Sequence, residues 1–150
     1  MQTATIWRPT DTSKTYPPVI FGYGSSETEL YGGTDIAKHD NLLNEIASMG
    51  YVVIAPMGMP VQTGDEKIPC STVLMYNDIV ATGTFLIDSP FYSVKIDITN
   101  GFGFVGYKES ATIMFNAMPI WPASLKAAAT IGIEMGSLSA FGTDPLLSAS

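Results

Sequence analysis

The chain has 150 residues, of which 46% are hydrophobic and 14% are charged. This length and composition predict one folded domain over residues 1–150 and exclude a disordered chain, because the apolar content suffices for one buried core. Acidic residues number 14 and basic residues seven, which gives a net charge of −7. Because this charge repels phosphate groups, nucleic-acid binding is not expected.

The cysteine content and the length of the apolar runs indicate which classes of protein the chain does not belong to. Cys70 is the only cysteine, and no Cys/His spacing matches a zinc site, so we expect no internal disulfide and no metal. No apolar run approaches the ~18 residues that cross a bilayer, and no signal-peptide pattern opens the chain. We therefore expect a soluble protein without membrane contact, and the sequence leaves its compartment open.

The first half of the chain alternates apolar runs with polar or glycine-rich segments. Two short apolar runs are typical of strands buried on both faces of a parallel sheet. The segment between them has apolar residues at helical spacing, with Asp40 as a candidate internal cap. The expected elements are a strand at Thr3 to Trp7, a turn segment at Arg8 to Pro18, a strand at Val19 to Gly22, a polar loop at Tyr23 to Gly33, a helix at Asp35 to Met49 and a strand at Tyr51 to Ala55.

The second half continues the alternation. Ser71 or Thr72 caps a helical stretch that is interrupted by Gly83, and the later segment VKIDIT is strand-like. Strands and helices in this order predict an α/β fold with a mostly parallel, doubly wound sheet, in which ligands gather at the carboxyl ends of the strands. The remaining elements are a loop at Met57 to Cys70, a strand at Phe102 to Val105, a helix at Glu109 to Met118, a strand at Ala127 to Ile133 and a tail at Gly136 to Ser150.

A strand, a sharp turn and a helix follow one another between Lys95 and Met118. Gly106 can adopt the positive φ that a tight corner needs. Such a corner holds one residue, here Lys108, at the carboxyl edge of the sheet. Enzymes with this strand–turn–helix arrangement have their nucleophile at that position. A lysine at this position is the least expected feature of the sequence.

Four segments resemble successive parts of α/β-hydrolases: YPPVIFGYGSS, LLNEIASMGYVVIAP, VKIDITNGFGFVGYKESA and SLKAAATI. They are most similar to the branch that contains dienelactone hydrolases, chlorophyllase-like esterases and cutinase-like polyester hydrolases. The resemblance covers roughly Thr5 to Ile133. It implies an α/β-hydrolase-like core and a relation to carboxylic ester hydrolases.

The resemblance assigns roles to individual positions. The backbone N–H groups of Tyr23 and Glu109 fall where the family holds the oxyanion. Lys108 falls on the nucleophilic serine and Ser110 on the closing glycine. The elbow therefore reads Gly106, Tyr107, Lys108, Glu109, Ser110 in place of Gly-x-Ser-x-Gly, and the nucleophile is missing.

The resemblance also implies that the domain is shortened at its C-terminus. In the family the acid and the histidine of the triad follow the elbow. Here the only histidine, His39, precedes the elbow, and Asp144 is the one acid of the tail. An incomplete triad predicts impaired or absent serine-hydrolase activity.

Other chemistry remains open beside this interpretation. A desolvated Lys108 would serve as a nucleophile or base, while Ser110 is more simply a polar residue of the first helical turn. Cys70, His39 and Asp65 would compose a thiol triad, but nothing in their spacing brings them together, and His39 alone reads as a polar residue at a helix start. Gly101 to Gly106 matches the dinucleotide fingerprint GxGxxG without the acid that normally follows.

The expected partner is a small-molecule ester or another apolar ligand. Met57 and Met59 lie in a loop near the expected site, and Trp121 between two prolines either walls a cleft or packs in the core. A noncatalytic binding module with an apolar pocket is the alternative function. No cofactor is expected, and an exposed sheet edge predicts a homodimer.

Overall fold

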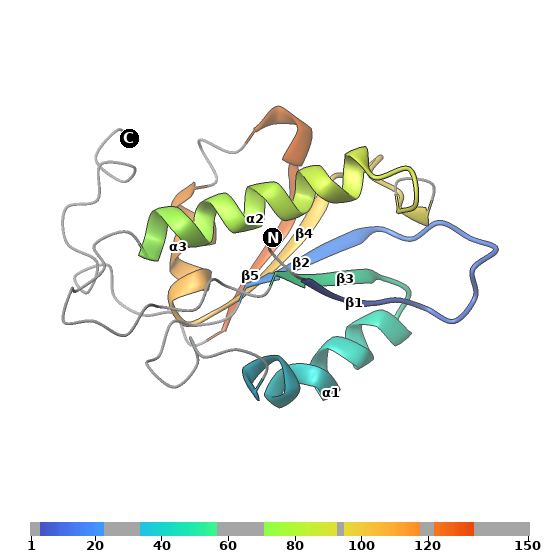
Figure 1. Cartoon of the computed structure of the whole chain (residues 1–150), viewed down its shortest axis with the longest axis horizontal. Coiled ribbons are helices and arrows are strands. Elements are labelled where there is room, and N and C mark those ends of the chain that lie inside the picture. Colours follow the sequence, from blue (N-terminus) through green and yellow to red (C-terminus); the bar gives the residue numbers. More distant parts are fainter. Residues whose placement is uncertain (1–3, 23–33, 57–70, 93–94, 118–121, 134–150) are drawn as a thin grey trace.

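The computed structural model describes residues 4–22, 34–56, 71–92, 95–117 and 122–133. Together they form three layers, with a sheet between helices (Figure 1). The alternation of strands and helices along the chain is the one that the sequence predicts. The elements are β1 (Ala4–Trp7), β2 (Pro18–Gly22), α1 (Thr34–Ser48), β3 (Val52–Pro56), α2 (Ser71–Asp88), β4 (Phe102–Tyr107), α3 (Glu109–Ala117), the short 3-10 helix η3 (Ala123–Leu125) and β5 (Ala127–Ile133).

The strands form one sheet in the order β1-β3-β2-β4-β5. Strand β1 runs antiparallel to β3, whereas β3, β2, β4 and β5 are parallel to their neighbours. Helices α2 and α3 cover one face of the sheet and α1 covers the other (Figure 1). The predicted mostly parallel, doubly wound α/β sheet is confirmed, and α2 runs unbroken through Gly83.

Side chains of the central strands alternate between two buried clusters. Ile20, Ile54 and Phe104 belong to the cluster beneath α2 and α3. Phe21 and Val53 belong to the cluster beneath α1. Because both faces are covered, every residue of β2 and β3 is buried, which explains why these strands read as continuous apolar runs in the sequence.

The strand-like interpretation of VKIDIT is wrong. Only an isolated bridge between Tyr16 and Ile96 forms in the described part of this segment. The Asp97 carboxylate accepts a hydrogen bond from the Thr99 N–H at 2.9 Å. Hydrogen bonds from Thr99 also hold the pKa of Asp97 below its usual value. An Asp side chain that bonds the backbone two residues ahead favours a turn, and here it overrides β propensity.

Asp40 does not cap a helix, because α1 begins at Thr34 and continues past it. Its carboxylate instead accepts a hydrogen bond from the indole N–H of Trp7 at 2.7 Å. Trp7 is a buried core residue of β1, so this bond joins the edge strand to α1. Among the described residues no helix is both long and apolar enough to cross a bilayer.

Candidate functional site

A sharp corner joins β4 to α3, with Lys108 as the single residue between them. Lys108 has φ of 53°, and within the described ranges it is the one non-glycine residue with positive φ. This left-handed conformation costs an L-residue about 1–2 kcal/mol. Such strain is retained where the surrounding structure imposes it, and it is common at functional corners.

Backbone hydrogen bonds hold Lys108 in this conformation. Its N–H donates to the carbonyl oxygen of Ile133 in β5 at 2.9 Å. Its carbonyl oxygen accepts from the N–H groups of Ala111 at 3.1 Å and Thr112 at 3.3 Å, which begin α3. The main chain of Lys108 therefore links the end of β4, the start of α3 and the end of β5.

Two glycines allow the close approach of strands and helix at the corner. A Cβ on Gly106 would lie 2.4 Å from the Cα of Ala111, which no side chain can accommodate. A Cβ on Gly22 would lie 2.8 Å from the Cβ of Ser110 and 2.9 Å from the Cε of Met114. Gly22 is also paired with Gly106 in the sheet. Gly22, the last residue of β2, therefore lies beside the corner.

Aromatic contacts support the corner from the α1 side. His39 lies inside α1 and is half-buried, whereas the sequence suggested a polar residue at a helix start. Its ring lies 5.2 Å from that of Phe21 and 4.8 Å, edge-on, from that of Tyr107. The Nζ of Lys108 lies 5.0 Å from the centroid of the same Tyr107 ring. His39 precedes the core residue Leu43 by four positions, and this spacing was the signal for an inward-facing side chain.

The charged end of Lys108 thus meets an aromatic face. Such a cation–π contact stabilises the ammonium by about 0.5–1 kcal/mol at an accessible site. Ser110, in the first turn of α3, is only 2% exposed and packs beneath Gly22. Among the described residues, no three His, Cys, Asp or Glu side chains gather in a way that could hold a metal ion.

Several residues singled out from the sequence cannot be placed. Tyr23, Met57, Met59 and Trp121 lie outside the described residues. Cys70, Asp65 and Asp144 also lie outside them. Glu109 is the first residue of α3, so its N–H stands at the helix start, where the oxyanion donor was expected.

The GxGxxG match does not form a nucleotide-binding loop. Gly103 and Gly106 lie within β4, and Gly101 immediately precedes it. In the dinucleotide fingerprint the glycines lie in the turn between strand and helix, where the pyrophosphate reaches the backbone. Here side-chain packing surrounds Gly103, since an added Cβ would lie 3.1 Å from Val19 Cγ2.

No protein-family model matches the sequence, and no curated protein matches it either. Solved structures do match in fold. A fungal esterase from Rhizomucor miehei gives a TM-score of 0.64 at 17% identity, with 94% of this chain and 42% of that one covered. Esterase B from Lactobacillus rhamnosis gives 0.61 at 18% identity, with 88% and 42% covered.

A third match is brefeldin A esterase, a bacterial homologue of human hormone-sensitive lipase. Its TM-score is 0.57 at 16% identity, with 79% of this chain and 31% of that one covered. The chain spans less than half the length of each of these three proteins. At such low identity the likeness concerns the fold alone. With its mostly parallel sheet and its strand–turn–helix corner, the chain has an α/β-hydrolase-like fold.

Proposed function

We propose that this chain is an α/β-hydrolase-like relative of carboxylic ester hydrolases that does not turn over esters by the serine mechanism. The observation that carries this proposal is Lys108 at φ 53° between β4 and α3. In ester hydrolases of this fold, the residue at that corner is the nucleophilic serine. The matched esterases support the relation to ester hydrolysis, and the four sequence segments favour the dienelactone hydrolase, chlorophyllase-like and cutinase-like branch.

A lysine cannot do what the serine does at this corner. The serine hydroxyl attacks the ester carbon after passing its proton to a base, and an acyl-enzyme forms. An ammonium has no lone pair for that attack, and the face of Tyr107 stabilises the ammonium form. Ser110 offers no substitute, because its side chain is buried beneath Gly22.

Hydrolysis of p-nitrophenyl butyrate by the chain, by Lys108→Ala and by Lys108→Ser tests this proposal. We expect the unaltered chain and Lys108→Ala to release p-nitrophenol at the same rate, because Lys108 takes no part in turnover. Lys108→Ser gains little unless a base is supplied, since a serine without a base is a poor nucleophile. A rate that falls at least about tenfold in Lys108→Ala would contradict the proposal and establish lysine chemistry.

The second candidate function is a noncatalytic binding module for an apolar ligand. Its specific support is a cavity of about 320 Å³ whose lining is mainly aliphatic and aromatic. Pockets that bind small molecules start at about this volume and have this kind of lining.

A further inference from the structure

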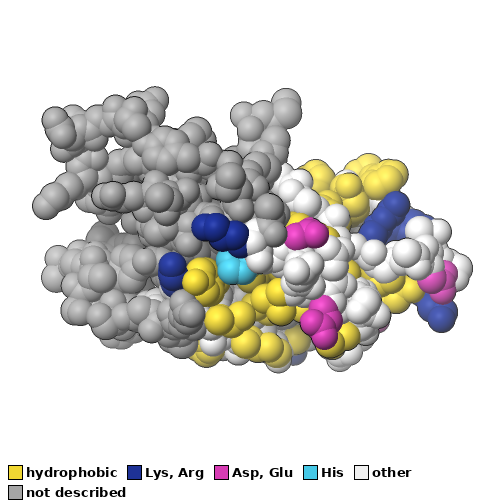
Figure 2. Space-filling model, turned by 90° about the horizontal axis from the view of Figure 1, so that it is seen from below, with side chains coloured by type: hydrophobic (Ala, Val, Ile, Leu, Met, Phe, Trp, Pro, Cys, Tyr) yellow, Lys and Arg dark blue, Asp and Glu magenta, His cyan; other side chains and the backbone are white. Residues whose placement is uncertain are grey.

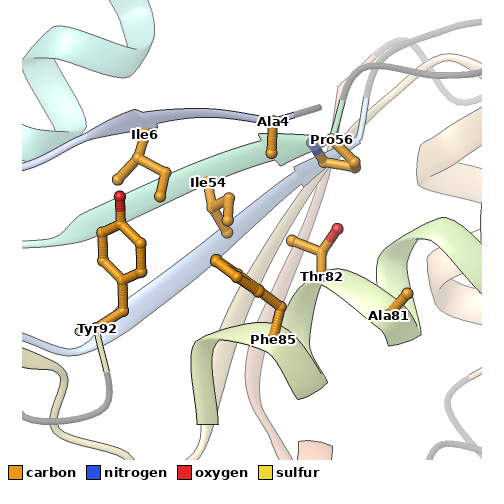
Figure 3. A pocket seen from close by; sticks show the side chains of 8 residues that line it. All are labelled: Ala4, Ile6, Ile54, Pro56, Ala81, Thr82, Phe85 and Tyr92. Carbon is orange, nitrogen blue, oxygen red and sulfur yellow. The ribbon is translucent and has the colours of Figure 1, made fainter. Parts of the chain in front are cut away.

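A cavity lies between the β1–β3 side of the sheet and α2, apart from the Lys108 corner. Side chains of β1 and β3 form one wall, and side chains of α2 together with Tyr92 form the other (Figure 3). Strand β2 separates β3 from β4 in the sheet. The cavity is therefore a different place from the corner at the end of β4.

Small residues at one end and aromatic rings at the other shape the space. Ala4 on β1 and Ala81 on α2 leave room near Pro56. Phe85 reaches from α2 toward Ile54 (Figure 3) and yet is 48% exposed. Phe85 therefore lines the cavity and is at the same time accessible from solvent.

The aromatic wall is fixed by ring contacts. The ring of Tyr92 lies 5.6 Å from that of Phe85. It also lies 4.8 Å from the ring of Phe91, in an edge-on arrangement at 82°. Aromatic pairs in this geometry gain about 0.5–1.5 kcal/mol beyond the area that they bury. The wall is therefore arranged before any ligand arrives, which lowers the entropy cost of binding.

The lining chemistry selects a neutral ligand. Among the described residues that line the cavity none is Asp, Glu, Lys, Arg or His, and Thr82 and Tyr92 are the two that carry a side-chain hydroxyl. In Figure 3 the Tyr92 hydroxyl points toward Ile6 and the Thr82 hydroxyl toward Pro56. A charged group would lose its hydration here without gaining a partner of opposite charge.

We propose that this cavity binds one small neutral aromatic molecule, whose rings pack against Phe85 and Tyr92. Its volume of about 320 Å³ lies at the small end of the range of ligand pockets, which suits a molecule of two or three rings. This proposal rests on the binding-module function of the preceding section. It does not depend on the chemistry of Lys108.

Two fluorescent probes that share one skeleton test the ligand class. N-phenyl-1-naphthylamine is neutral, and 8-anilinonaphthalene-1-sulfonate carries a sulfonate on the same rings. We expect the neutral probe to bind saturably at one site and the sulfonate to bind at least about tenfold more weakly, because its charge must be desolvated. Equal affinity for the two probes, or no saturable binding of the neutral one, would overturn the proposal.

Two substitutions on α2 test the location. Ala81 lines the cavity and is exposed, whereas Thr84 on the same helix is exposed and does not line it. Ala81→Phe should weaken binding of the neutral probe at least about tenfold by filling the space, and Thr84→Phe should change it less than about twofold. Equal effects of the two changes would contradict the location, with circular dichroism verifying that both variants fold.

Lys108→Ala separates the two sites. If the neutral probe occupies the cavity, Lys108→Ala leaves its affinity unchanged whatever that variant does to ester turnover. A loss of probe binding in Lys108→Ala would place the probe at the corner and overturn the assignment.

Discussion

At the scale of single residues, Lys108 combines an unfavourable backbone conformation with a charged side chain. Its φ of 53° is held by hydrogen bonds to Ile133, Ala111 and Thr112. Those bonds use only main-chain atoms, so the corner would keep its shape with another side chain. The backbone conformation does not explain why this residue is a lysine, because glycine would fit a positive φ better.

This leads to a prediction about stability. Lys108→Val should have a free energy of unfolding about 1–2 kcal/mol lower than that of Lys108→Gly, because a β-branched residue is strained at positive φ. The same pair of changes at Lys126, whose φ is −50°, provides the control and should show no such deficit for valine. Urea denaturation measures both pairs. Equal stabilities of Lys108→Val and Lys108→Gly would show that the corner relaxes.

At the scale of elements, the closeness of β2 and α3 determines the shape of the corner. Ser110 lies in the first turn of α3, and its Cβ would lie 2.8 Å from a Cβ on Gly22. Gly22 therefore has no room for a side chain. The strand end that leads toward Tyr23 is fixed against the first turn of α3 by this contact.

A double-mutant cycle tests the contact. Gly22→Ala should destabilise the fold, and Ser110→Gly should relieve part of that loss, giving a coupling free energy of about 1 kcal/mol. Gly103→Ala serves as the control, because its new Cβ would meet Val19 Cγ2 at 3.1 Å and not Ser110. Strictly additive effects of Gly22→Ala and Ser110→Gly in chemical denaturation would refute the contact.

Local sequence patterns predicted most of the helices and strands. They did not predict the contacts between residues that are far apart in the chain. Apolar runs indicated β2 and β3, and helical spacing after Gly106 indicated the corner. The positive φ expected at Gly106 is instead adopted by Lys108. The Trp7–Asp40 hydrogen bond and the His39–Tyr107 contact join residues far apart in the chain, so no local pattern contained them. The cavity depends on two alanines from different elements, Ala4 and Ala81, and could not be found from spacing.

At the scale of the whole molecule, the edge strand β5 is apolar. Within the described residues β5 is an edge strand. Its segment AAATIGI carries no charge, and Ile131 is 56% exposed. On the face seen in Figure 2, hydrophobic side chains are interspersed with Lys or Arg, His and acidic side chains. An uncharged edge strand with exposed apolar residues favours pairing with another chain.

We expect a homodimer through β5. Ile131→Lys should shift the chain toward monomer, because a lysine on an edge strand opposes pairing. Met49→Lys introduces the same charge at another exposed apolar position after α1 and should leave the dimer intact. Multi-angle light scattering measures the mass in each case, and a monomer at every concentration of the unaltered chain would contradict this expectation.

The central claim is that the corner of this α/β-hydrolase fold no longer carries out serine chemistry. Intact-mass spectrometry after incubation with diethyl p-nitrophenyl phosphate tests it most directly, because that reagent phosphorylates the activated nucleophile of serine esterases and leaves an adduct that can be mapped. We predict that the unaltered chain gains no adduct. A stoichiometric adduct on Ser110 or another hydroxyl would contradict the account and identify a working nucleophile.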